Sequence, residues 1–124
     1  KRMSTARGGA GGGIVNLSSA AARIGSPNEF IDYAASKGAI DAMTLGLAKE
    51  FATQGVRVNA VRPGLIDTEI HASAGAPDRI ERFTPMIPMR RAGTATEVAE
   101  AILWLLSREA AYVTGTFIDV SGGR

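Results

Sequence analysis

The stretch Val56-Arg57-Val58-Asn59-Ala60-Val61, which Pro63-Gly64 closes, decides the fold class of this chain. It is a short apolar run rich in β-branched residues, a pattern typical of a strand buried inside a sheet. Two further runs of this kind occur in the 124 residues, at Ile14-Val15-Asn16-Leu17 and at Thr116-Phe117-Ile118-Asp119-Val120. The chain is therefore predicted to contain three buried strands.

A helix is expected between the first two strands. Ser26 can act as its N-cap, Pro27 suits the first helical position and Glu29 completes a capping box. Asp32 adds negative charge near the helix start, and Gly55 marks the helix end. The apolar stripe that should face the sheet consists of Ala39, Ile40, Met43, Leu47 and Phe51.

A second helix is expected before the last strand. Thr94 and Glu97 have the spacing of another capping box. Apolar residues then recur at helical spacing, which predicts a side facing the core; they are Val98, Ala101, Ile102, Leu105 and Leu106. The preceding stretch, residues 65–93, has weak periodicity and three prolines, and its length suggests a functional flap instead of a plain connection.

The order strand, helix, strand, flap, helix, strand predicts the topology. Consecutive strands joined through helices run parallel, with right-handed crossovers. Parallel sheets of this kind are covered by helices on both faces. The expected class is therefore an α/β fold, and the length allows one domain at most.

Five glycines crowd the segment that precedes the first strand, namely Gly8, Gly9, Gly11, Gly12 and Gly13. Their spacing never matches G-x-G-x-x-G, and a dinucleotide-binding loop follows a strand instead of preceding one. We therefore interpret this segment as a flexible surface connection.

The composition excludes several classes of protein. Fourteen basic and twelve acidic residues leave a net charge of +2, and their even mixing argues against a nucleic-acid or membrane surface. Without cysteine, neither a disulfide framework nor a thiolate zinc site is possible, and no metal site is expected. No apolar run approaches the roughly 20 residues of a membrane span, and the first residues lack the apolar stretch of a signal peptide. We expect a soluble, cytoplasmic protein.

The segment Tyr33-Ala34-Ala35-Ser36-Lys37 suggests chemistry. Tyr33 and Lys37 are four residues apart, so both project from one face of a helix. A free phenol exchanges its proton only near about pH 10, and an ammonium beside it favours the phenolate. With a serine hydroxyl nearby, the pair would suit proton transfer to or from an alcohol or carbonyl. Taken alone, however, such a segment more often marks a solvated helix face.

Four blocks of sequence together resemble one enzyme family. They are Ile14-Val15-Asn16-Leu17-Ser18-Ser19, Tyr33-Ala34-Ala35-Ser36-Lys37, Val56-Arg57-Val58-Asn59-Ala60-Val61-Arg62-Pro63-Gly64 and Tyr112-Val113-Thr114-Gly115. In order and spacing they resemble the short-chain dehydrogenase/reductase family, classical type, from about Gly12 to Gly123. The resemblance implies the C-terminal half of a Rossmann-type doubly wound parallel sheet with three α/β/α layers.

The resemblance also implies an oxidoreductase that transfers a hydride between a nicotinamide and the CH–OH or carbonyl group of a substrate. Tyr33 matches the catalytic acid/base, and Lys37 matches the lysine that assists it and binds the nicotinamide ribose. Ser19 matches the serine that orients the substrate, because Gly25 follows it at the family's offset, and Ser18 is the alternative. From Ser19 to Tyr33 the chain is one residue longer than the common pattern.

The cofactor contacts come from the same resemblance. Pro63 and Gly64 match the turn over the nicotinamide, and Ile66 and Thr68 match the positions that bind its carboxamide. Tyr33 and Lys37 belong to this cofactor-binding set as well. The cofactor would be NAD or NADP, and the strand that discriminates between them is absent from this sequence.

Residues 65–93 would then form the lid over the substrate. His71 lies in this segment, and we interpret it as incidental to catalysis. Met86 and Met89 could line an adaptable apolar pocket. We expect Trp104, on the last helix, to serve packing or subunit contact.

Three family features do not occur in this chain: the glycine-rich cofactor loop, the residue that reads the adenosine ribose and the catalytic asparagine. Residues 1–124 are therefore expected to be the C-terminal half of one domain, with the cofactor-binding half elsewhere in a longer polypeptide or on a separate chain. The expected partners are that half, a small alcohol or ketone and further copies in a homotetramer. The alternative is a non-catalytic assembly or binding fragment that retains the motifs.

Overall fold

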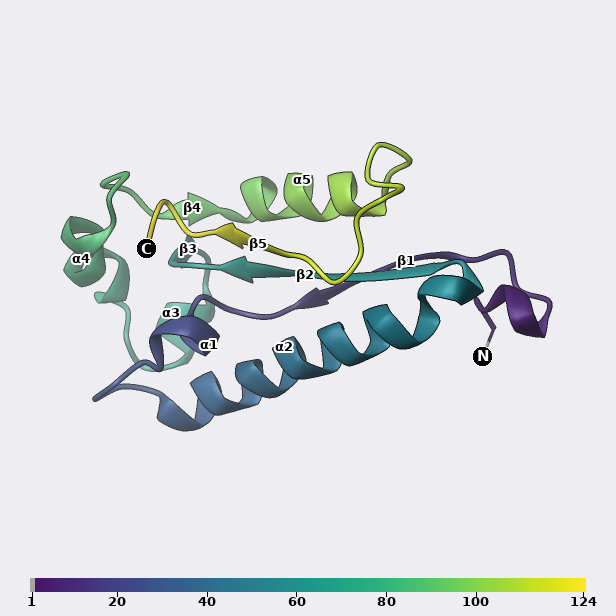
Figure 1. Cartoon of the computed structure of the whole chain (residues 1–124). Coiled ribbons are helices and arrows are strands. Elements are labelled where there is room, and N and C mark those ends of the chain that lie inside the picture. Colours follow the sequence, from purple (N-terminus) through teal and green to yellow (C-terminus); the bar gives the residue numbers. More distant parts are fainter. Residues whose placement is uncertain (1) are drawn as a thin grey trace.

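A parallel three-stranded sheet lies at the centre of the computed structural model, which describes residues 2–124 (Figure 1). Its strands are β1 (Gly12–Leu17), β2 (Val56–Pro63) and β5 (Phe117–Val120), in the order β1-β2-β5. Pairing of Ile14 with Val58 and of Val61 with Ile118 sets the register. The sequence prediction of three parallel strands is confirmed, and β2 is the central strand.

Two long helices cover the sheet from opposite sides (Figure 1). Helix α2 (Ile31–Phe51) packs on one face, where Ala48, Val56 and Val58 are buried. Helix α5 (Ala95–Leu106) packs on the other face, where Val61 and Leu105 are fully buried. This is the expected α/β arrangement with both faces covered.

Shorter elements complete the structure; they are η1 (Thr5–Arg7), α1 (Ala21–Ile24), η2 (Ala52–Gln54), β3 (Ile66–Asp67), α3 (Ile70–Ser73), α4 (Arg79–Phe83), η3 (Thr84–Met86) and β4 (Gly93–Thr94). Most of them lie in residues 65–93, which we call the lid segment. Strands β3 and β4 pair in parallel, so the two ends of the lid segment are hydrogen-bonded to each other. The segment is therefore a structured excursion from the end of the sheet.

Helix α5 begins as its sequence predicts. The Thr94 hydroxyl accepts a hydrogen bond from the Glu97 backbone N–H at 3.2 Å, and the Glu97 carboxylate accepts from the Thr94 N–H at 2.8 Å. Val98 and Leu105 are buried as expected, whereas Leu106 is 45% exposed. Leu106 follows Val98 by eight residues, and at about 100° per residue this spacing puts Leu106 about 80° around the helix from Val98. Leu106 therefore lies at the edge of the buried stripe, and the prediction for it was wrong.

The predicted start of α2 is wrong. The helix begins at Ile31, and the residues expected to cap it form an irregular turn in which Ser26 and Asn28 have positive φ values of 45° and 62°. The Glu29 carboxylate, expected in the capping box, instead contacts Arg79 of α4 at 2.6 Å. A tertiary ion pair therefore replaces the local capping interaction. The end of α2 is confirmed, since η2 continues it to Gly55, which has a left-handed conformation.

The face of α2 that meets the sheet matches the prediction only in part: Leu47 and Phe51 pack against the core as expected. Its buried residues are Ala34, Thr44 and Ala48, whereas Ala39 and Met43 are exposed. Small and polar side chains on this face let the helix lie close to the sheet and bond to it, as Thr44 does with Asn16, so apolar spacing alone does not mark the whole face. No helix in the described part of the chain, α2 included, is long and apolar enough to cross a membrane.

The glycine run is only partly a connection. Gly12 and Gly13 belong to β1 and pair with Val56 and Arg57. Gly11 has φ +75°, and a Cβ atom there would lie 2.5 Å from the Gly55 carbonyl oxygen. The interpretation of the whole run as a flexible surface connection was therefore wrong, because its second half lies against neighbouring backbone.

Candidate active site

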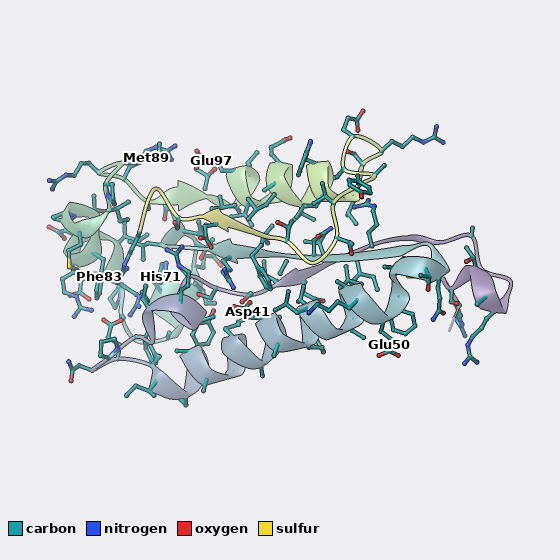
Figure 2. The ribbon with its side chains drawn as sticks, viewed as in Figure 1. Asp41, Glu50, His71, Phe83, Met89 and Glu97 are labelled. Atoms are coloured by element: carbon teal, nitrogen blue, oxygen red, sulfur yellow. The ribbon has the colours of Figure 1, made fainter. Side chains whose placement is uncertain are left out.

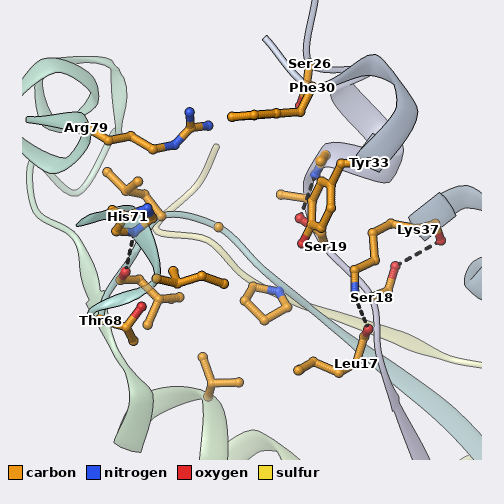
Figure 3. A pocket seen from close by; sticks show the side chains of 18 of the residues that line it. Leu17, Ser18, Ser19, Ser26, Phe30, Tyr33, Lys37, Thr68, His71 and Arg79 are labelled. Carbon is orange, nitrogen blue, oxygen red and sulfur yellow. Dashed lines mark hydrogen bonds between the residues drawn. The ribbon is translucent and has the colours of Figure 1, made fainter. Parts of the chain in front are cut away.

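A cavity of about 660 Å³ opens at the carboxyl ends of β1 and β2. One wall is formed by these strand ends and the first turns of α2, and the other by α3, α4 and the start of α5 (Figure 3). We call these the sheet wall and the lid wall. Ligands of open α/β sheets bind outside the carboxyl ends of the strands, so the cavity lies where a ligand is expected.

Tyr33 and Lys37 project into this cavity from one face of α2 (Figure 3). The Lys37 ammonium lies 5.5 Å from the centre of the Tyr33 ring and donates a hydrogen bond to the Leu17 carbonyl at 2.8 Å. The tyrosine is 45% exposed. The end of β1 thus holds the Lys37 ammonium beside the Tyr33 ring. The tyrosine itself remains accessible from the cavity.

The two serines after β1 have different surroundings. Ser18 is buried, and its hydroxyl donates to the Asp41 carboxylate at 2.6 Å. Ser19 is half-buried at the cavity, and its hydroxyl oxygen accepts from the Ala21 N–H at 3.1 Å. The Ser18 proton is therefore committed to α2, whereas the Ser19 proton is directed to no protein acceptor among the described residues.

Besides Tyr33 and Lys37, the other four residues expected to contact a cofactor line the same cavity, namely Pro63, Gly64, Ile66 and Thr68. Gly64 lies where β2 passes β5, and its N–H donates to the Val120 carbonyl at 3.0 Å. A Cβ atom at this position would lie 2.8 Å from Cα of Ser121. A glycine here lets the two strand ends approach closely.

The lid wall contains His71, whose Nε2 lies 2.7 Å from the Ile66 carbonyl oxygen. Because a carbonyl only accepts, Nε2 carries the proton in this arrangement. Met86 and Met89 do not line the cavity and are 58% and 60% exposed, so the prediction of a methionine-lined pocket was wrong. Both follow α4 in the lid segment. Trp104 is half-exposed on α5 and also lies outside the lining.

Several lining residues were not expected from the sequence, among them Phe30 and Arg79. The Arg79 guanidinium lies 5.3 Å from the centre of the Phe30 ring and pairs with Glu29 at 2.6 Å. These contacts join the loop before α2 to the lid wall. The sequence prediction started α2 too early and so placed Phe30 inside the helix. With the helix beginning at Ile31, Phe30 belongs to the loop before it, which lines the cavity.

Metal ligands are not gathered in the described residues, which contain no group of three or more His, Asp or Glu side chains able to hold an ion. The cavity instead combines a phenol, an ammonium and a hydroxyl with largely apolar walls. Such a set can transfer protons and orient a polar substrate atom.

A family model described as enoyl-(acyl carrier protein) reductase matches residues 2–124. The chain belongs to the short-chain dehydrogenase/reductase family. The recognition of this family from four sequence blocks is thereby confirmed. Members of the family in general use NAD(P) and act as oxidoreductases.

Curated short-chain dehydrogenase/reductase relatives extend beyond this chain. An uncharacterized oxidoreductase YgfF of Escherichia coli is 62% identical over 124 residues, which are all of this chain and 50% of that protein. A galactitol 2-dehydrogenase (L-tagatose-forming) of Cereibacter sphaeroides is 44% identical, over 98% of this chain and 48% of its own length. The chain spans about half the length of the curated relatives it matches.

Solved structures of the family show the same fold. A glucose/ribitol dehydrogenase-type member from Brucella melitensis superposes with a TM-score of 0.80 at 38% identity, over 90% of this chain and 44% of that chain. A 3-oxoacyl-[acyl-carrier protein] reductase from the same organism gives 0.79 at 43% identity, over 90% and 41%. The parallel sheet with flanking helices is therefore part of a Rossmann-like α/β fold.

Proposed function

We propose that this chain carries the proton-transfer and substrate-binding half of an NAD(P)-dependent oxidoreductase that acts on an alcohol or carbonyl group. The observation that carries the proposal is the convergence of Ser19, Tyr33 and Lys37 on one cavity at the strand ends. These side chains come from two separate elements, so their meeting is a property of the fold and not of local sequence. A solvated helix face would not bring the three together.

In this proposal Tyr33 gives its proton to the substrate oxygen during reduction and takes it back during oxidation. The Lys37 ammonium, held by the Leu17 carbonyl at 2.8 Å, stabilises the phenolate that remains. Ser19 donates a hydrogen bond to the same substrate oxygen and aligns it with the phenol. Ser18 is the weaker candidate for this role, because its hydroxyl is already bound to Asp41.

The residues around the cavity suit a nicotinamide nucleotide. Lys37 uses one of its three N–H donors on Leu17, which leaves two for ribose hydroxyls. The Thr68 hydroxyl and the backbone at Pro63, Gly64 and Ile66 line the adjoining part of the cavity and could hold a carboxamide. When bound, the nicotinamide supplies or accepts the hydride. The protein supplies orientation, charge and the proton.

We propose further that the whole protein forms a homo-oligomer, a tetramer by family resemblance. Exposed apolar side chains on α2 and α5 support this, namely Met43, Leu45, Leu103 and Trp104. These side chains expose apolar surface on the two covering helices, and a second copy of the protein could bury that surface.

The decisive test is Tyr33→Phe in the protein that includes the cofactor-binding half. We expect turnover to fall by about 10³-fold or more, since the variant has no proton to transfer. Nucleotide affinity, measured by fluorescence titration, should change little because the ring remains in place. Tyr112→Phe, at a fully exposed tyrosine outside the cavity, is the matched control. Normal turnover in Tyr33→Phe would refute the assignment.

A further inference from the structure

A largely buried ion pair lies beside the candidate active site, between α2 and the sheet. Asp41 of α2 lies between the helix and the sheet, in contrast with the exposed Glu50 of the same helix (Figure 2). Its partner is Arg62 of β2, and the two side chains are only 15% and 17% exposed. With Ser18 they form what we call the Ser18–Asp41–Arg62 cluster.

Both carboxylate oxygens of Asp41 are used. Oδ1 accepts from the Ser18 hydroxyl at 2.6 Å. Oδ2 accepts from Nε of Arg62 at 3.0 Å and from a terminal guanidinium nitrogen at 2.7 Å. The Ser18 oxygen also lies 3.3 Å from the Lys37 carbonyl oxygen. One carboxylate thus joins the end of β1, the middle of α2 and the end of β2.

Each member of the cluster is a close neighbour of a candidate site residue along the chain. Ser18 directly precedes Ser19, Asp41 lies one helical turn after Lys37, and Arg62 directly precedes the Pro63-Gly64 turn. The cluster therefore connects the backbone of the three segments that carry the proposed chemistry. A displacement of any one segment would break a hydrogen bond in the cluster.

Arg62 is held on its other side as well. Its guanidinium lies 4.0 Å from the centre of the Phe117 ring and 3.9 Å from the Asp119 carboxylate, which itself pairs with Arg23 at 2.7 Å. The two positive charges of Arg23 and Arg62 are therefore balanced by the two negative charges of Asp41 and Asp119. Removal of the Asp41 charge alone leaves a net positive charge next to the cavity.

We propose that Asp41 is a positioning residue for the reaction: it holds the Ser19, Lys37 and Pro63 segments in register and neutralises Arg62 beside the site. This inference rests on the proposed function. Burial of an ion pair is costly, and apolar residues often stabilise a fold equally well. The position of this pair, next to three site segments, points to alignment as its contribution.

The test uses the protein with its cofactor-binding half and four variants. Asp41→Asn removes the charge, Arg62→Lys keeps the charge but loses the two-point contact, and Asp41→Asn/Arg62→Met removes both charges. Glu50→Gln is the matched control, since it removes one exposed carboxylate from the same helix. For each protein, kcat, KM and the pH dependence of kcat are measured and corrected for the fraction that binds nucleotide.

We expect Asp41→Asn to lower kcat by about 10- to 100-fold with little change in KM, because small misplacements of catalytic groups have effects of this size. The uncompensated Arg62 cation favours phenolate, so the midpoint of the pH profile should move to lower pH. Arg62→Lys should lower kcat with an unchanged midpoint. The double variant should regain the native midpoint, and Glu50→Gln should match the native protein throughout.

The pH measurement is interpretable because the other charged groups of the cavity stay unchanged in every variant; they are Lys37, His71, Arg79 and Arg124. If Asp41→Asn behaves like Glu50→Gln, the proposal is overturned. It is also overturned if kcat falls only with the nucleotide-binding fraction while the midpoint stays fixed, since that result would mean a purely structural role.

Amide hydrogen exchange separates this proposal from the proposed function. We expect Asp41→Asn to accelerate exchange in residues 31–41 and 17–19 relative to Glu50→Gln, whether or not the protein turns over a substrate. Native-like exchange in these segments would refute the positioning role by itself. Normal turnover in Tyr33→Phe would instead refute the proposed reaction and leave the exchange result standing.

Discussion

The sheet wall and the lid wall of the cavity are held in place by different kinds of interaction. Behind the sheet wall lie buried hydrogen bonds such as those of Ser18 and Thr44, the latter fully buried. The lid wall contacts the loop before α2 through Arg79, which pairs with Glu29 and lies over the Phe30 ring. Buried polar networks specify one arrangement. The Arg79–Glu29 pair, whose side chains are 18% and 22% exposed, is a contact between two side chains and joins fewer segments than the Asp41 carboxylate does. We infer that the sheet wall positions the groups for proton transfer, whereas the lid wall shapes the part of the cavity that receives the substrate.

The largest effect in this comparison should come from Lys37→Met in the protein with its cofactor-binding half. The variant keeps the length of the side chain but loses the ammonium and its bond to the Leu17 carbonyl. We expect turnover to fall by about 100-fold, with a greater loss at neutral than at high pH, because phenolate is no longer stabilised. Steady-state kinetics across pH measure this. Lys49→Met, near the exposed far end of α2, should have native kinetics.

Thr44→Val should show how firmly the sheet wall is built. The Thr44 hydroxyl accepts from the Asn16 amide at 2.9 Å and donates to the Ile40 carbonyl at 2.8 Å. Valine has nearly the same shape but leaves the amide without its acceptor, so we expect a loss of about 1–3 kcal/mol in the free energy of unfolding. Urea denaturation measures it. An exposed threonine, as in Thr53→Val, is the control, and an equal loss there would contradict the comparison.

Glu29→Gln should loosen the lid wall without altering the chemistry. Arg79 would lose its carboxylate partner, and we expect KM for the substrate to rise several-fold while kcat changes little, because the change loosens the lid wall and leaves Ser19, Tyr33 and Lys37 untouched. Glu81→Gln removes a carboxylate from α4 itself, outside the cavity, and serves as the matched control. A large drop in kcat for Glu29→Gln alone would place the pair in the catalytic machinery.

The smallest effect concerns the end of the lid segment, where Glu97 caps α5. Hydrogen bonds from Arg91 and from the Thr94 backbone lower the pKa of Glu97 from 4.5 to about 2. A depressed carboxyl pKa stabilises the fold above the unfolded value, so this contribution is complete above about pH 4.5 and is lost as the pH falls toward 2. Thermal unfolding of Glu97→Gln should therefore depend less on pH in this window. Identical pH dependence in both proteins would refute the assignment.

The two helices show how much local sequence can predict. The capping box and the apolar spacing predicted α5 correctly, because the helix start is held by local hydrogen bonds and its buried side is apolar. The same signals predicted α2 only in part, because Glu29 pairs with Arg79 instead of capping and the inner face of the helix carries Thr44 and Asp41. Those residues interact with β1, β2 and the lid segment, and such partners are invisible in a local pattern.

The sequence by itself determined three parallel strands, the covering helices and the family, since β-branched runs and the motif spacing are local properties. It also placed Tyr33 and Lys37 on one helical face, because four residues make about one turn. Only the tertiary structure decided that Ser18 turns inward while Ser19 faces the cavity, and that Asp41 meets Arg62. These outcomes depend on contacts between segments distant in sequence, whose geometry arises only when the sheet and α2 pack together.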